Sequence, residues 1–218
     1  MKIIDLPTKT FSSGNIQDFA AQLGPSGIQN LFRLLYSAYL RLCESGKIKE
    51  PMTEPEITEE LYVKLQQIVI ASGDSAIIPC HEKAHKKTKT GPGKTPTIDL
   101  CFRDDFDSEA YFGFECKKLE TSNKKRFDDY IVGGVCRYLF GAYSKKSSKG
   151  SMISFVINGD IAKIVSEIKC RVDNICCLSK MEKAEIIDGF SNQYESRHRR
   201  SNMSPFHLYH LFFEFPSK

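Results

Sequence analysis

Two apolar segments near the middle of the chain, residues 97–102 and 111–117, have the composition of β-strands. A short polar segment separates them, which favours pairing as a hairpin. Each segment carries one acidic residue, Asp99 in the first and Glu115 in the second. An acid in a buried strand needs a partner, because an unpaired buried charge is costly. The sequence therefore predicts a sheet with an acidic position built into two neighbouring strands.

Lys117 follows Glu115 at a distance of two residues. Because side chains alternate between the faces of a strand, Glu115 and Lys117 share one face and Cys116 lies on the other. If the hairpin brings Asp99 to the same end of the sheet, two carboxylates and one ammonium converge. This combination suits a divalent cation, an activated water and a phosphodiester. The alternative is an ordinary ion pair between Asp99 and Lys117 at a sheet edge.

Hydrophobic periodicity and turn residues predict the remaining elements. We expect helices over residues 26–47, 56–72, 125–143 and 161–175, and further strands over 75–80, 151–158 and 206–215. The segment 81–95 has no periodicity and is predicted to be a surface loop. The order of elements indicates an α/β fold, a mixed central sheet flanked by helices on both faces. We expect residues 1–50 to be an N-terminal helical extension and residues 51–218 to be one compact domain.

Composition is that of an ordinary globular protein, with 41% hydrophobic and 27% charged residues. No segment approaches the roughly 18 consecutive apolar residues of a membrane span. The first residues carry a charge too early, and an apolar run too short, for a secretory signal. The eight cysteines contain no C-x-x-C pair and most have apolar neighbours, which indicates reduced, mostly buried thiols. A cytoplasmic location without membrane association is the expectation.

The net charge of +4 is mild, but the basic residues are clustered. Clusters flanking an acidic centre offset its repulsion for a polyanion, which favours a nucleic acid as partner. Any single cluster is more readily explained as a solvated loop. The clusters lie at residues 83–94, 117–118, 124–126, 145–149 and 197–200.

The segment Thr97-Ile98-Asp99, followed by Phe114-Glu115-Cys116-Lys117, resembles the PD-(D/E)xK nuclease superfamily, whose fold is restriction-endonuclease-like. The resemblance covers residues 56–159. It implies that Asp99 and Glu115 ligate Mg²⁺, with Mn²⁺ as a substitute, and that the backbone carbonyl of Cys116 is a third ligand. It also implies that Lys117 orients or activates the attacking water, or neutralises charge on the phosphorane. A lysine beside a bound cation is expected to have a lowered pKa.

The chain departs from the pattern of the superfamily at two places. Ile98 stands where the name-giving proline usually occurs, at a position that carries no chemistry. The glutamate that the superfamily has on its first core helix is ambiguous here among Glu54, Glu56, Glu59 and Glu60. We favour Glu56 as the fourth catalytic residue, with Glu60 second, because both lie beside the apolar stripe of the predicted helix.

Three further features carry weaker signals. A second acid-x-lysine triplet, Glu167-Ile168-Lys169, falls in a predicted helix and is expected to be helix surface. Arg137 follows on the helix after the strands and is more readily explained as an exposed helix residue than as a phosphate ligand. His207 and His210 in the last strand face opposite sides and are expected to be core histidines.

The resemblance predicts a metal-dependent endonuclease that cuts double-stranded DNA in restriction, defence or repair and leaves a 5′-phosphate. Two alternatives remain open: an RNA-cutting nuclease of the same fold, and a non-catalytic nucleic-acid-binding module. A motor or recognition subunit is a further possible partner. Cutting both strands with one site per chain would favour a homodimer.

Overall fold

The protein contains a seven-stranded mixed sheet with the strand order β1-β2-β3-β4-β7-β6-β5. The computed structural model describes residues 18–73, 78–84, 97–103, 110–200 and 203–215. Strands β3, β4 and β7 run parallel in the centre, and the remaining neighbours are antiparallel. The strands are β1 (Ile78–Ala84), β2 (Thr97–Arg103), β3 (Tyr111–Leu119), β4 (Lys149–Val156), β5 (Cys177–Lys183), β6 (Gln193–His198) and β7 (Phe206–Glu214).

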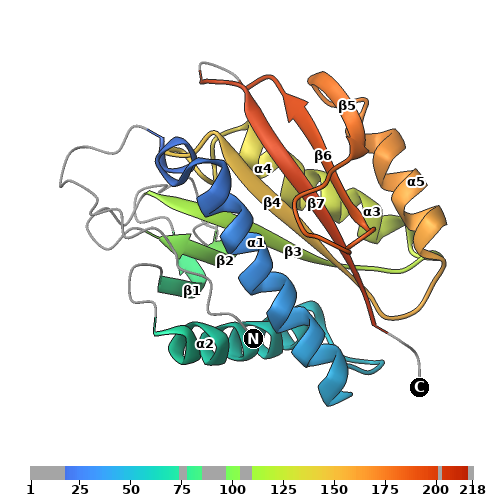
Figure 1. Ribbon diagram of the computed structural model, residues 1–218. Coiled ribbons are helices and arrows are strands. Elements are labelled where there is room, and N and C mark those ends of the chain that lie inside the picture. Colours follow the sequence, from blue (N-terminus) through green and yellow to red (C-terminus); the bar gives the residue numbers. More distant parts are fainter. Residues whose placement is uncertain (1–17, 74–77, 85–96, 104–109, 201–202, 216–218) are drawn as a thin grey trace.

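Helices cover both faces of this sheet, as predicted. Figure 1 shows α1 lying across one face with α2 beside it, and α3, α4 and α5 on the other face. The helical elements are α1 (Phe19–Ser45), α2 (Glu54–Ser72), α3 (Lys124–Tyr130), the π-helix η1 (Ile131–Val135), α4 (Cys136–Leu139) and α5 (Ile161–Val172). The α/β class is therefore confirmed.

Both N-terminal helices end where the sequence predicted. Gly46 and Gly73 adopt the left-handed conformation that favours glycine and terminates a helix. Helix α1 begins earlier than expected, because Asp18 caps it through the amides of the first turn. A break at Gly24, directly before Pro25, separates that first turn from the rest of the helix.

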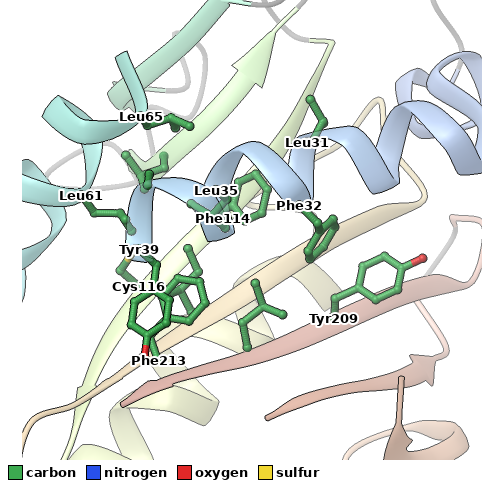
Figure 2. Close-up of a cluster of buried hydrophobic side chains, with 14 of the residues drawn as sticks. Leu31, Phe32, Leu35, Tyr39, Leu61, Leu65, Phe114, Cys116, Tyr209 and Phe213 are labelled. Carbon is green, nitrogen blue, oxygen red and sulfur yellow. The ribbon is translucent and has the colours of Figure 1, made fainter. Parts of the chain in front are cut away.

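Helix α1 shares its hydrophobic core with the central strands (Figure 2). Phe32 is fully buried and meets the rings of Phe114 and Tyr209 at centroid distances of 5.7 and 5.1 Å. Tyr39 stacks on Phe213 at 4.2 Å. Residues on both sides of the predicted boundary at position 50 thus contribute to one core.

The C-terminal third differs most from the prediction. Strands β5 and β6 lie in a polar stretch for which no element was predicted, and β5 forms an edge of the sheet. Polar side chains occupy β5, where only Met181 is fully buried, so the period-two signal is weak.

The helix predicted over residues 125–143 ends at Leu139 and contains a π-helical turn. Strand β1 extends to Ala84, into the predicted loop, whose residues 85–96 lie outside the described part of the chain.

His210 is a fully buried core histidine, as predicted, and belongs to a hydrogen-bonded chain of side chains. Its Nδ1 lies 2.7 Å from the hydroxyl of Tyr130, and its Nε2 lies 2.8 Å from Ser196 Oγ. Ser196 also contacts His198 Nε2, and His198 Nδ1 contacts the carbonyl of Ile175. Because that carbonyl only accepts, His198 donates from Nδ1, Ser196 donates to His198, His210 donates to Ser196, and Tyr130 donates to His210. One carbonyl therefore fixes the direction of every bond in the chain.

All eight cysteines are free thiols, but only Cys101 and Cys116 are buried, so the prediction that most are buried was wrong. Among the described helices, none combines the length and apolar character that crossing a membrane requires.

Candidate active site

Two carboxylates bind backbone amides of β3 where β2 diverges from it. The β2–β3 ladder runs as far as Leu100 opposite Phe114. Beyond that point, Asp99 Oδ2 accepts the amide of Cys116 at 2.7 Å, and Glu54 Oε2 accepts the amide of Lys118 at 2.9 Å. Side-chain oxygens thus replace the carbonyls of a neighbouring strand, which gathers acidic groups at one end of the hairpin.

Lys117 lies at the centre of this group. Its Nζ donates to Glu115 Oε1 at 2.8 Å, to Glu54 Oε1 at 3.1 Å and to the carbonyl of Cys116 at 2.6 Å. Burial opposes the charge of this ammonium, but the carboxylates of Glu115, Glu54 and Asp99 outweigh burial and raise the pKa of Lys117. In the metal-free protein the pKa of Lys117 is therefore raised. The lowered pKa that we expected for Lys117 beside a bound cation stays a prediction.

Glu115 is the most deeply buried acid of the group, with 2% of its surface exposed. Its Oε2 is buried without a hydrogen-bond partner among the described residues. Burial, reinforced by the charge of Asp99, raises the pKa of Glu115 to about 8, although Lys117 and Arg137 act in the opposite direction. Burial likewise raises the pKa of Asp99. The site thus holds a carboxyl group with unused coordinating capacity.

The glutamate that reaches the site is Glu54, and not the favoured Glu56. Glu56 instead accepts the backbone amide and the hydroxyl of Thr53, both at 2.7 Å, and closes a capping box at the start of α2. Glu60 pairs with Lys47 at 3.1 Å and is also outside the site. The spacing of Thr53 and Glu56 is a sequence signature of this cap, and it could have excluded Glu56 and placed Glu54 at the first helical position.

The π-helix η1 packs closely against the side chains of Glu115 and Lys117. A Cβ at Gly134 would lie 3.7 Å from Glu115 Cγ and only 2.3 Å from Met152 Cε, and a Cβ at Gly133 would lie 3.8 Å from Lys117 Cε. Glycine at position 134 therefore permits the close approach of helix to sheet. Mid-helix π-turns are frequent at functional sites.

Arg137, on the turn after η1, extends over the same carboxylate. Its Nη1 lies 3.8 Å from Glu115 Oε1 and donates a hydrogen bond to the hydroxyl of Tyr143. That hydroxyl contacts the carbonyl of Thr97 at 2.8 Å, which ties the helix to the start of β2. The sequence favoured an exposed helix residue over a phosphate ligand at Arg137, because its proximity to Glu115 depends on the packing of helix on sheet.

The chain matches no protein-family model, no curated protein and no solved structure. The geometry of the site therefore has to carry any functional inference alone. It brings together Asp99, Glu115 and Lys117, as predicted, with Glu54 in the place expected for Glu56.

Within the described residues, no three histidine, cysteine, aspartate or glutamate side chains form a ready metal-binding group. Instead, the Lys117 ammonium lies among the oxygens of Glu54, Glu115 and Cys116. Its positive charge offsets their negative charge, as that of a bound metal ion would. The donor set nevertheless fits a hard divalent cation, because Glu115 Oε2 is buried and unpartnered and the surrounding ligands are oxygens. Binding through the Cys116 carbonyl would require Lys117 to give up that contact.

The second acid-x-lysine triplet shows the contrast. On α5, Glu167 bonds Arg171 at 2.6 Å, and Lys169 lies 3.5 Å from Asp173. These side chains are about half exposed, at 45% for Glu167 and 43% for Lys169. The triplet is helix surface, as predicted, and it offers a matched control for the site.

Proposed function

We propose that this protein is a metal-dependent nuclease of the restriction-endonuclease-like type. It hydrolyses phosphodiester bonds, and its proposed substrate is double-stranded DNA. The observation that carries the proposal is Glu115: a carboxyl group buried to 98%, with one oxygen unpartnered, beside a lysine and a second acid. A purely structural ion pair would not require an unpartnered oxygen. A stable fold tolerates such a costly group when function retains it.

The arrangement of strands supports the same proposal. An antiparallel hairpin, β2–β3, carries the acids, and a helix then leads to the parallel strand β4. This is the order of elements that the resemblance to the superfamily implies. The free thiols fit the cytoplasmic location that we infer for such an enzyme.

Each side chain of the site has a separate role in this proposal. Asp99 and Glu115 would hold Mg²⁺ or Mn²⁺, which when bound lowers the pKa of water and polarises the phosphate. In the metal-free protein the carboxylates of Glu115, Glu54 and Asp99 raise the pKa of Lys117. A charged Lys117 would stabilise negative charge on the phosphate. Glu54 keeps Lys117 in position through a 3.1 Å hydrogen bond.

Cleavage of supercoiled plasmid in Mg²⁺ or Mn²⁺ tests the proposal, with single-stranded DNA and RNA as parallel substrates. The variants Glu115→Gln and Lys117→Met are compared with Glu167→Gln and Lys169→Met, which make the same changes on the surface of α5. We expect the first pair to lose activity by about 100-fold or more and the second pair to cut like the wild type. Chelation of the metal should also stop cleavage.

Two results would contradict the proposal. One is a wild-type protein that cuts none of the three substrates in either metal. The other is Glu115→Gln with wild-type activity. Cleavage of RNA alone would retain the site chemistry and replace DNA as the substrate.

A further inference from the structure

Arg137 is a cation beside the site with hydrogen-bonding capacity that the protein does not use. Its side chain is 44% exposed. Among the described residues, Tyr143 is the only hydrogen-bond acceptor of its guanidinium, and the distance of 3.8 Å to Glu115 is too long for a hydrogen bond. The remaining N–H groups of the fork therefore face solvent next to the buried carboxylate.

Lys117 is in the opposite situation. Its ammonium has three donors, and three oxygens of the protein accept from it. In this arrangement it offers charge to a phosphate but no free donor. The donors that are free before any rearrangement are therefore those of Arg137, whereas Lys117 gains a free donor only when a bound cation displaces it from the Cys116 carbonyl.

Electrostatics also call for a cation at this position. The group holds three acids, Asp99, Glu115 and Glu54, and one lysine, so it stays net negative even while Glu115 is protonated. A phosphodiester is repelled unless further positive charge is present. An arginine suits this role because its planar fork matches phosphate oxygens and stays charged throughout the physiological range.

We propose that Arg137 is a phosphate-binding residue, whose free N–H groups hold a non-bridging oxygen of the substrate phosphodiester beside Glu115. The inference rests on the proposed nuclease function and adds a substrate contact to it. Tyr143 is a positioning residue in this scheme, because it holds the guanidinium through one nitrogen and is anchored to Thr97. The rest of this partly exposed guanidinium makes no other hydrogen bond to the described residues.

The competing explanation is that Arg137 serves only to neutralise Glu115 or to anchor α4. These roles differ in how charge at position 137 affects the salt dependence of binding. Each phosphate contact by a cation contributes about one to the slope of log Kd against log salt concentration. A contact internal to the protein contributes nothing to that slope.

The test is binding of a fluorescein-labelled DNA duplex by anisotropy between 50 and 300 mM salt, with Ca²⁺ replacing Mg²⁺ to suppress cleavage. Variants are Arg137→Lys, which keeps the charge, and Arg137→Gln, which removes it. Arg33→Ala is the control, since Arg33 is similarly exposed at 37% but pairs with Asp188 and not with a residue of the site. Thermal unfolding verifies that every variant is folded, and cleavage in Mg²⁺ is measured in parallel.

We expect Arg137→Gln to weaken binding about tenfold and to reduce the salt slope by about one. Arg137→Lys should keep most of the slope but lose cleavage rate, because lysine lacks the fork. Tyr143→Phe should keep the slope and lower kcat. Arg33→Ala should behave like the wild type in every measurement.

An unchanged salt slope in Arg137→Gln would overturn the inference, even if activity fell. That result would leave the proposed nuclease function intact, provided that wild-type protein cuts and Glu115→Gln does not. Wild-type protein that neither binds nor cuts nucleic acid would instead overturn both.

Discussion

At the scale of single residues, Glu115 shows how far the site departs from what stability alone would select. The burial of its carboxyl group raises the pKa to about 8 from an ordinary value of 4.5. An acid with a raised pKa in the folded state favours folding below its unfolded pKa and loses that contribution as the pH rises. The cost of burying Glu115 therefore grows as the pH rises from 4.5 towards 8 and is greatest in alkaline solution.

Replacing this acid by its neutral isostere should stabilise the metal-free protein. We expect the advantage of Glu115→Gln over the wild type to be small below pH 4.5, to grow as the pH rises, and to level off above pH 8. Its full size should be roughly 3–6 kcal/mol. Urea unfolding at pH 5 and pH 8.5 measures the effect, with Glu167→Gln as the exposed control. An advantage that does not depend on pH would show that Glu115 ionises normally.

Glu54 and Glu56 differ in role although they are two residues apart. Glu54→Gln should lower the cleavage rate at least tenfold, because it weakens the bond that positions Lys117. Glu56→Gln should instead lower the melting temperature slightly and leave the rate unchanged, since Glu56 contacts only the cap of α2. Plasmid cleavage and thermal unfolding separate the two. The reverse pattern would restore Glu56 to the site.

At the scale of elements, the sequence was informative where burial imposes a pattern. The central strands and the N-terminal helices follow apolar runs and glycine caps, and the structure confirms them. Strands β5 and β6 were missed because one forms an exposed edge and their polar residues resemble a loop. Asp99, Glu115 and Lys117 were predictable from alternation along adjacent strands. Glu54 and Arg137 come from helices, and which helical residue meets a sheet depends on tertiary packing.

The buried histidine chain between β6, β7 and α3 is expected to make folding sensitive to acid. Burial lowers the pKa of His198 and lowers that of His210 further. A histidine with a lowered pKa stabilises the fold above its unfolded value, and that contribution is lost as the pH falls below about 6.5.

Glu115 has the opposite pH dependence, so the measurement is best made in the Glu115→Gln background. There we expect the free energy of unfolding to fall between pH 7 and pH 5 by roughly 1–3 kcal/mol. Ser196→Ala should cost a similar amount at pH 7.5, because it leaves ring nitrogens of both histidines unpaired. Constant stability between pH 5 and pH 7 would mean that the histidines are hydrated and not buried.

At the scale of the whole molecule, α1 contributes buried side chains to the same core as the sheet. Phe32→Ala should destabilise the protein by about 3–5 kcal/mol, because the lost ring packs against three others on the sheet. Unfolding should remain one cooperative transition by far-UV and near-UV circular dichroism. Leu40→Ala, at a residue of α1 that is 42% exposed, is the control. Two separate transitions would instead support an independent N-terminal extension up to residue 50.

The carboxylate of Glu54 links the helical layer to the reaction centre. Neighbouring residues of one strand hold its two oxygens, Lys117 through the side chain and Lys118 through the main chain. Any shift of α2 relative to β3 that exceeds the tolerance of a hydrogen bond must break one of these contacts. A partner that binds α1 and α2 and shifts α2 would in this way break the contact between Lys117 and Glu54 without moving any strand.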